Sequence, residues 1–320
     1  MRRFAKPIIV VSRCLGFDTC RYDGASVACP FARALRARAK LITVCPEMEI
    51  GLGVPREKIV LVRTAAGNTT LLQPATGRKL TRVMQQYARR RLDEIGEIDG
   101  FLLKSKSPSC GVGTCKLFGS SDPESGPIGR ESGLFAAEVE RRYPHLPAID
   151  ERTLDNHRQR ERWLTAVYAL AEFRRIARYR TTASLKRFHD YYRTLLETYN
   201  KTATNDAERL LTTARSPKRL FADYRSHLEH ILAGPVRPRS LVKAFEPAVA
   251  FYREYLTRQN IDRYYRTADS YLAGERSAAE LRGLIQVWGV RYDKSFIRDH
   301  ALYRPYPAEL GRVDDNRASE

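Results

Sequence analysis

Hydrophobic positions follow two different patterns along the chain. In the first 150 residues, short apolar runs alternate with segments whose apolar positions recur every three or four residues. Strands are predicted over four runs: Ile8–Val11, Leu41–Val44, Ile59–Val62 and Phe101–Leu103. Helices are predicted over Pro30–Ala39 and, with Thr81 as its N-terminal cap, through about Ile95, and the polar stretch Thr64–Gly77 predicts a loop. This order indicates an α/β N-terminal domain with a parallel, Rossmann-like sheet.

From about residue 151 the strand-like runs largely vanish and helical periodicity takes over. One apolar helix face is predicted by the spacing of Leu185, Phe188, Tyr192, Leu195 and Tyr199. Asn205 with Glu208, and Ser277 with Glu280, predict helix N-terminal caps, and breaks are expected at Pro217, Gly234, Pro235 and Pro238. We therefore expect residues 1–150 to form the α/β domain, 151–312 an all-α C-terminal domain, and 313–320 a polar tail.

Bulk composition narrows the class of protein. The 320 residues are 43% hydrophobic and 29% charged, which is typical of a globular chain. No apolar run approaches the roughly 20 residues needed to span a membrane. The N-terminus is basic and then apolar, but Ile8–Val11 is far shorter than the roughly 7–15 residues of a secretory core. We expect a cytoplasmic protein with no membrane partner.

The net charge of +19 indicates a polyanionic partner, and without a long basic amphipathic helix it favours nucleic acid over anionic lipid. Residues 1–150 contribute +9 and residues 151–320 contribute +10. The segment RYYRTADSY (263–271) suits phosphate contact and base stacking, although most individual aromatics are expected to fill helix contacts. The basic candidates for RNA binding are Arg215, Lys218, Arg219, Arg263 and Arg266.

Six cysteines all lie in the first 115 residues, and in a large cytoplasmic chain this favours metal ligands or redox groups over disulfides. Cys14, Cys45 and Cys110 each follow a predicted strand. If these strands are parallel neighbours, the three thiols lie along the carboxyl edge of one sheet, where open α/β folds bind ligands. Cys20 and Cys29 are expected to fill the core.

The spacing of the cysteines bears on which metal they would hold. Zinc usually takes paired cysteines at short spacing, and apart from Cys110 and Cys115 no close pair is present. Single cysteines from separate loops fit an iron–sulfur cluster at least as well. A cluster held by only three protein thiolates leaves one iron open to a substrate.

Three stretches around these cysteines resemble the thiouracil desulfidase domain family, over residues 7 to about 150. They are SRCLGFDTCRYDG (12–24), CPEMEIGLGVPR (45–56) and LKSKSPSCG (103–111). The remainder resembles the helical domain that some of these proteins carry, through FHDYY (188–192), HLEHIL (227–232) and HALYRPYPAEL (300–310). The two-domain arrangement resembles bacterial desulfidases that remove sulfur from 4-thiouridine in tRNA.

The resemblance implies a [4Fe–4S] cluster held by Cys14, Cys45 and Cys110, whose fourth iron takes the thiocarbonyl sulfur of a thiolated uracil or uridine. Hydrolysis then leaves a carbonyl oxygen on the base and releases hydrosulfide. In this reading the helical domain binds tRNA, and the modified base flips out of its stack and binds at the edge of the sheet. Cys115 or Cys20 would prevent this chemistry if either closed the open iron.

Polar residues beside the cysteines are the catalytic candidates. Glu47 is a base or proton donor, or else a helix-start carboxylate. Asp23, in RYDG, serves the site or an ordinary turn. Ser107 could hydrogen-bond the nucleobase or shuttle a proton. Lys104 could stabilise developing negative charge or simply face solvent, and Ser105 and Ser109 could only cap the following turn.

Two other functions fit the same sequence. One is a desulfidase of free thiouracil or thiolated nucleosides, whose helical domain serves oligomerisation. The other is a non-catalytic RNA-binding protein with a structural zinc.

Overall fold

The computed structural model describes residues 3–120, 122, 125–213, 215–298 and 300–312, so the predicted polar tail lies outside the described residues. The chain forms two compact units. One contains residues 7–156, and the other contains residues 157–312 together with the N-terminal residues up to Lys6. No helix in the described ranges is both long and apolar enough to cross a membrane.

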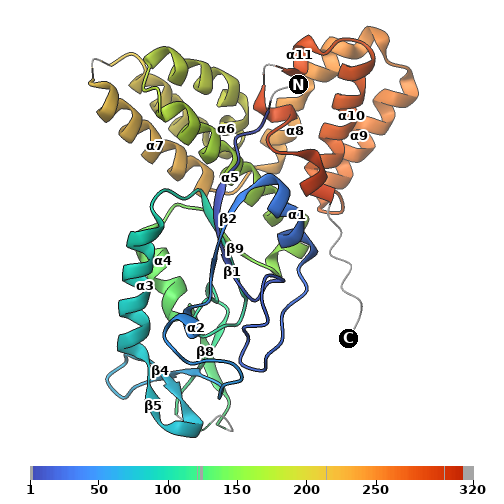
Figure 1. Ribbon diagram of the computed structural model, residues 1–320. Helices are drawn as coiled ribbons and strands as arrows, with labels where there is room; N and C mark the ends of the chain where they lie inside the picture. The colour runs from blue at the N-terminus through green and yellow to red at the C-terminus, as the bar shows by residue number, and fades with distance from the viewer. Residues whose placement is uncertain (1–2, 121, 123–124, 214, 299, 313–320) are drawn as a thin grey trace. The chain divides into compact units, whose positions relative to one another are not determined.

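A four-stranded parallel sheet forms the centre of the α/β unit (Figure 1). Its strands lie in the order β2 (Lys40–Val44), β1 (Ile8–Ser12), β6 (Gly100–Leu103) and β9 (Ala148–Asp150). Ile9, Val10 and Val11 are fully buried, which explains why this strand reads as a continuous apolar run. The parallel sheet expected from the sequence is confirmed.

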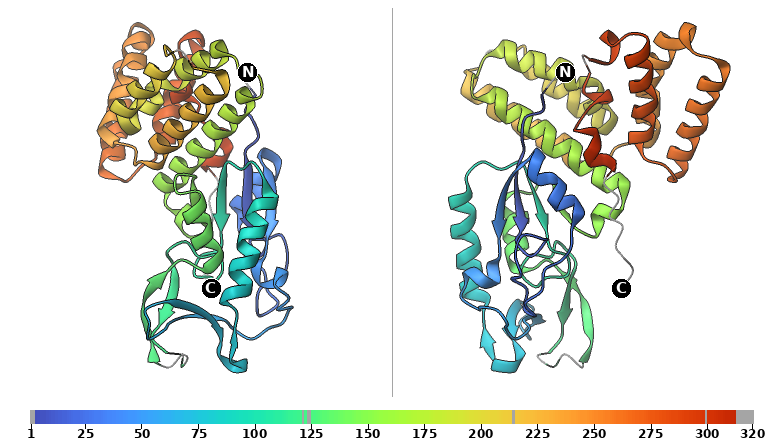
Figure 2. Two further views of the ribbon diagram at one scale, coloured as in Figure 1. Left: turned by 90° about the vertical axis from the view of Figure 1, so that its left-hand side faces the viewer. Right: turned by 45° about the vertical axis from the view of Figure 1, so that its right-hand side comes forward.

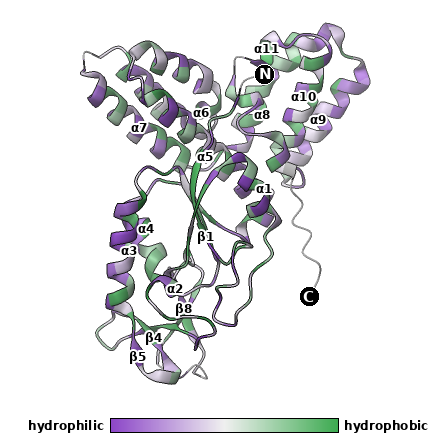
Figure 3. Cartoon of the chain, in the orientation of Figure 1, coloured by the Kyte–Doolittle hydropathy of each residue, from purple (hydrophilic) through white to green (hydrophobic). Residues whose placement is uncertain are grey.

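Helices cover this sheet on both sides in Figure 1: α1 (Pro30–Arg38) on one, and α3 (Thr81–Ile95) with α4 (Leu134–Arg142) on the other. Each helix buries apolar residues on one face, as expected for amphipathic helices. Figure 3 shows the corresponding hydrophobic colour along β1. The cap expected at Thr81 is wrong, because its hydroxyl accepts from the Leu71 amide and Leu80 precedes the helix.

A second, mixed sheet of five strands was not expected. Its order is β5 (Arg78–Lys79), β4 (Thr69–Gln73), β3 (Val60–Arg63), β7 (Cys115–Phe118) and β8 (Pro127–Glu131). The predicted loop over Thr64–Gly77 is therefore wrong in part, because Gly67 adopts a left-handed turn that folds β4 antiparallel onto β3. Figures 1 and 2 show this sheet beyond the carboxyl edge of the parallel one.

The second unit is helical, as expected. Its principal helices are α5 (His157–Ala177), α6 (Thr182–Leu210), α7 (Pro217–Ala233), α8 (Pro238–Tyr252), α9 (Arg258–Ala273), α10 (Ala278–Arg291) and the short α11 (Ser295–Arg298). The five residues predicted to form one apolar face of α6 are all buried. The Ser277–Glu280 capping box is confirmed.

The cap predicted at Asn205 is wrong. Asn205 lies inside α6, and the helix instead breaks at Asn200, whose backbone is non-helical. The Asn200 side chain accepts from the amide of Ala203, which is the bond of an N-terminal cap. Two helices therefore meet end to end here.

Candidate active site

The first thiol follows β1 directly. Ser12 ends the strand fully buried, and Cys14 lies in the turn that comes next. The turn is fixed by bonds from the Arg13 amide to the Val44 carbonyl, 2.8 Å, and from the Val27 amide to the Cys14 carbonyl, 2.7 Å. Cys14 is the only one of the six cysteines not fully buried.

The second thiol belongs to Cys45, the residue at the N-cap position of a one-turn helix, α2 (Pro46–Glu49), that follows β2. The amide of Cys45 donates to Oε1 of Glu49 at 3.1 Å. Glu49 also accepts from Arg13 at 2.8 Å and from the Tyr87 hydroxyl at 2.7 Å. The carboxylate that accepts from the amide at the start of the helix is therefore Glu49. Glu47 does not bond this amide.

The third thiol lies in the loop after β6. Ser107 Oγ accepts from the amides of Ser109 at 3.2 Å and Cys110 at 3.1 Å, which shapes the turn. Gly133, which caps α4, approaches this loop so closely that a Cβ there would lie 2.5 Å from the carbonyl carbon of Ser109. The amides of Phe135 and Ala136 both donate to the Ser109 carbonyl, at 3.0 and 3.1 Å. The first turn of α4 therefore clamps the Cys110 loop.

One cavity of about 960 Å³ brings these segments together. Cys14, Cys45 and Cys110 all border it, with Glu47 and Ser107. Cys20 also borders it, and the Cys45 thiol donates to the Cys20 carbonyl at 3.8 Å. Cys115 does not; it begins β7 and borders a neighbouring hollow.

Burial raises the pKa of three of the thiols that border the cavity. Burial first, and the nearby Cys45 second, raise the pKa of Cys14 to about 12 and that of Cys20 to about 12. Burial also raises the pKa of Cys110 well above its usual value. A bound metal group would displace these protons, because thiolates and not thiols are its ligands.

The donor atoms that border the cavity indicate which groups it could hold. In the part of the chain that the structure describes, no three His, Cys, Asp or Glu side chains are placed to hold a single metal ion. Three thiols nevertheless border one cavity, and cysteine is the usual ligand of an iron–sulfur cluster. Cys14, Cys45 and Cys110 are thus a suitable donor set for a cluster.

Glu47 lies on the cavity wall in a fixed orientation. Its Oε1 accepts from Ser109 Oγ at 3.0 Å, and its Oε2 accepts from Arg56 Nε at 2.9 Å and Nη2 at 2.5 Å. Arg56 also donates to the carbonyls of Cys20 at 3.1 Å and Gly53 at 2.9 Å. Arg56 therefore ties the Glu47 carboxylate to the Cys20 loop, a role that its sequence position does not signal.

Lys104 faces a buried carboxylate and not only solvent. Its Nζ lies 2.5 Å from Glu151 Oε1, and the amide of Ser105 donates to Oε2 at 2.7 Å. Burial opposes ionisation of Glu151, but Lys104 and Ser105 outweigh it and lower its pKa below the usual value. Glu151 follows β9, so the rule that directs attention to carboxyl ends of parallel strands would have found it.

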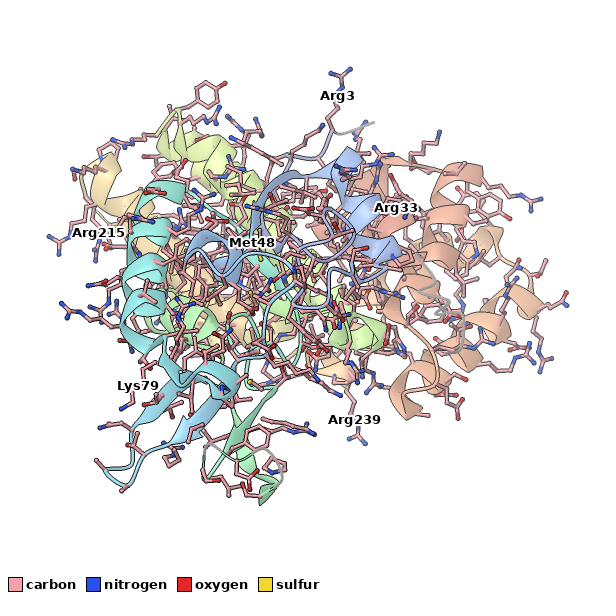
Figure 4. All side chains as sticks on the ribbon, turned by 60° about the horizontal axis from the view of Figure 1, so that its bottom comes forward. Arg3, Arg33, Met48, Lys79, Arg215 and Arg239 are labelled. Carbon is pink, nitrogen blue, oxygen red and sulfur yellow. The ribbon has the colours of Figure 1, made fainter. Side chains whose placement is uncertain are left out.

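The remaining predicted residues lie elsewhere. Asp23 does not border the cavity; its carboxylate accepts from Arg21 at 3.0 Å and from the Ala25 amide at 3.1 Å, as in a turn. In the helical unit, Lys218 and Arg219 are exposed at the start of α7, and Arg263 and Arg266 are exposed on α9. Arg215 forms an ion pair with Asp223, and Figure 4 shows it at the outer edge of the helices.

The motifs of the second half are packing motifs. In FHDYY, Phe188 and Tyr192 stack with ring centroids 4.5 Å apart, and buried His189 bonds the Tyr224 hydroxyl at 2.9 Å. Within RYYRTADSY, Tyr264 and Tyr271 are buried while Tyr265 is exposed. Most of these aromatics therefore serve the core, as expected.

Each half of the chain matches a known family, and known proteins are similar to part of it. The uncharacterized protein YbbK of Bacillus subtilis is 33% identical over 112 residues, which span 33% of this chain and 74% of that protein. A solved structure of the [4Fe–4S]-dependent thiouracil desulfidase TudS is 28% identical, with a TM-score of 0.38 over 47% of this chain and 93% of that one. Residues 193–307 match a family of unknown function, DUF1722. Residues 9–151 match the 2-thiouracil desulfurase model, and through them this chain belongs to the 2-thiouracil desulfurase family.

Proposed function

We propose that the α/β unit is a hydrolytic desulfidase of thiolated uracil, and that Cys14, Cys45 and Cys110 hold a [4Fe–4S] cluster. The observation that carries this proposal is the convergence of three thiols, from loops after three adjacent parallel strands, on one cavity. The cofactor named for TudS agrees with this donor set. When bound, the cluster would supply an iron without a protein ligand, a soft Lewis acid suited to thiocarbonyl sulfur.

Glu47 is the residue we assign to proton transfer. A water that adds to the thiocarbonyl carbon must lose a proton, and a carboxylate on the cavity wall serves as its base. The overall exchange adds the oxygen of one water molecule to the nucleobase, and it releases the sulfur as hydrosulfide together with one proton. Arg56 and Ser109 keep the carboxylate oriented for this step.

Ser107 and Lys104 act around the substrate. Ser107 Oγ already accepts two amide protons, so its own hydroxyl proton is available to a substrate atom in the cavity. Glu151 orients Lys104 at the cavity wall, where the ammonium group can donate to the leaving sulfur as negative charge develops on it.

For the substrate we propose 4-thiouridine in tRNA. The net charge of +19 supports a polyanionic substrate, and a free base does not require it. The exposed basic residues of α7 and α9, Lys218, Arg219, Arg263 and Arg266, are our candidates for backbone contacts in the helical unit.

Anaerobic reconstitution followed by sulfide detection tests the proposal. Thiouracil, 4-thiouridine and thiolated tRNA are assayed side by side, and sulfide release from tRNA is expected. Cys45→Ser should lose both the visible colour of the cluster and activity, whereas Cys115→Ser, outside the cavity, should keep both. Glu47→Gln should keep the colour and lower kcat by roughly 10²–10⁴-fold.

Three outcomes would overturn parts of this reading. A colourless protein with stoichiometric zinc removes the cluster. Activity in Cys45→Ser removes the ligand assignment. Sulfide release from free thiouracil but not from tRNA retains the chemistry and removes the tRNA substrate.

A further inference from the structure

A second hollow of about 810 Å³ lies beside the thiol cavity in the same unit. Tyr22, Lys58 and Lys106 border both spaces, so the two are adjacent. Its other walls come from the second sheet and the turn after β4, and include Pro74, Ala75, Lys116 and Phe118. Figure 1 shows this sheet beyond the carboxyl edge of the parallel one, where the thiols lie.

The charges lining this hollow are mostly positive. Lys58, Lys106 and Lys116 stand against one carboxylate, Glu57, while Arg56 is already paired with Glu47. Within the ranges that the structure describes, none of the three lysines forms an ion pair. Lys58 instead lies over the ring of Tyr22, 5.3 Å from its centroid, which fixes it at the border between the two spaces.

Lys106 holds its position at a conformational cost. Its φ of 58° is left-handed, a conformation that glycine or asparagine adopts more easily. The Thr114 hydroxyl fixes this backbone by accepting the Lys106 amide at 2.9 Å. A lysine in a conformation that suits glycine better indicates that its side chain is needed at this position. Here that side chain is a cation that borders both spaces.

Lys116 shows a second unfavourable arrangement. In the β7–β8 pair it lies directly opposite Arg130, so two cations share one face of the sheet. Like charges in opposed positions destabilise a strand pair. An anion bound at this face would relieve that repulsion.

We propose that this second hollow, bordered by Lys58, Lys106 and Lys116, binds the sugar–phosphate backbone on either side of the thiolated nucleotide. The lysines contact phosphates, and Phe118 offers an aromatic face to a neighbouring base. A positively charged groove that also carries an aromatic side chain for base stacking is the usual form of a single-strand nucleic-acid site, and Ile59, Val60 and Pro74 add apolar surface to this one. The inference rests on the proposed desulfidase activity and assigns polynucleotide recognition to the catalytic unit itself.

The test compares 4-thiouridine with a trinucleotide that carries 4-thiouridine at its centre, both with the full-length reconstituted protein. Desulfuration of the nucleoside measures the chemical step alone. The ratio of kcat/KM for the trinucleotide to kcat/KM for the nucleoside therefore measures what the groove contributes. We expect Lys58→Gln/Lys116→Gln to lower this ratio by about tenfold, since an exposed charged contact contributes up to about fivefold. The matched control is Lys40→Gln, an exposed lysine at the amino end of β2, which should leave the ratio unchanged.

Equilibrium binding of the same trinucleotide is the second readout. The slope of log affinity against log salt should fall by about 0.7 per lysine removed. An unchanged ratio and slope in the double variant would overturn the groove while leaving nucleoside desulfuration intact. Equal competition by an oligoglutamate peptide of the same charge would also overturn it, because the site would then select charge and not a nucleotide.

Discussion

Replacement of Gly133 by alanine tests whether α4 positions the Cys110 loop. An added Cβ would lie 2.5 Å from the Ser109 carbonyl carbon, 2.6 Å from its oxygen and 2.7 Å from the Pro108 carbonyl carbon. Real Cβ contacts are not found below 3.0 Å, and ordinary contact begins at 3.4 Å. All three atoms are backbone, so no side-chain rotation relieves the clash. The loop that carries Cys110 must move by close to an ångström.

The expected cost is that of overpacking, about 1–3 kcal/mol. A displacement of this size also moves the Cys110 thiol relative to Cys14 and Cys45. We therefore expect Gly133→Ala to lower the urea midpoint and, in protein that is still folded, the iron content per chain after reconstitution.

Gly129→Ala is the matched control. Gly129 lies on β8, and a Cβ there meets nothing within 4 Å. Far-UV circular dichroism separates unfolding from loss of iron in a folded protein. If Gly133→Ala matches the control in both urea midpoint and iron content, the clamp does not position the cluster ligand.

Three further predictions concern groups that fix the fold around and beyond the site. Glu49→Gln weakens the bonds to Arg13, Tyr87 and the Cys45 amide. The urea midpoint should fall by an amount equivalent to about 2–3 kcal/mol. Glu97→Gln, at an exposed position, is the control and should leave the midpoint unchanged. Asn200→Ala removes a cap inside α6 and should cost about 1 kcal/mol in thermal unfolding; no change would mean that the kink does not need the cap. Burial lowers the pKa of His189, so the unfolded chain binds its proton more readily, and stability should fall by up to about 1.4 kcal/mol per pH unit below about pH 6.5. Urea titrations at several pH values should show this slope, and His189→Asn should reduce it.

The parallel sheet and its thiol-bearing edge could be predicted because each depends on short-range signals. A buried parallel strand is a continuous apolar run, as Ile9, Val10 and Val11 show. Residues that follow neighbouring parallel strands lie at the carboxyl edge of the sheet, where open α/β folds bind ligands. Cys14, Cys45 and Cys110 were found in this way, and Glu151 was missed only because β9 was not recognised as a strand.

The second sheet could not be predicted in the same way. Strand β8 is largely exposed, so it carries no apolar run, and β3 pairs in parallel with β7 across more than fifty residues. Such pairings depend on tertiary contacts that no local pattern encodes. Arg56 was missed for the same reason, because its partners are Glu47 on α2 and the Cys20 carbonyl in the segment after β1.

The division of roles between Glu47 and Glu49 shows what local geometry adds to a motif. The two carboxylates are two residues apart on one helical turn, so they project about 200° apart around its axis. Glu49 returns to the Cys45 amide, and Glu47 reaches the cavity. Serine or aspartate at the cap position would satisfy a helix amide with its own side chain. The Cys45 side chain makes no such capping hydrogen bond and borders the cavity, while Glu49 accepts from the Cys45 amide. The CPEME stretch thus separates a carboxylate that holds the ligand loop from one that can take part in chemistry.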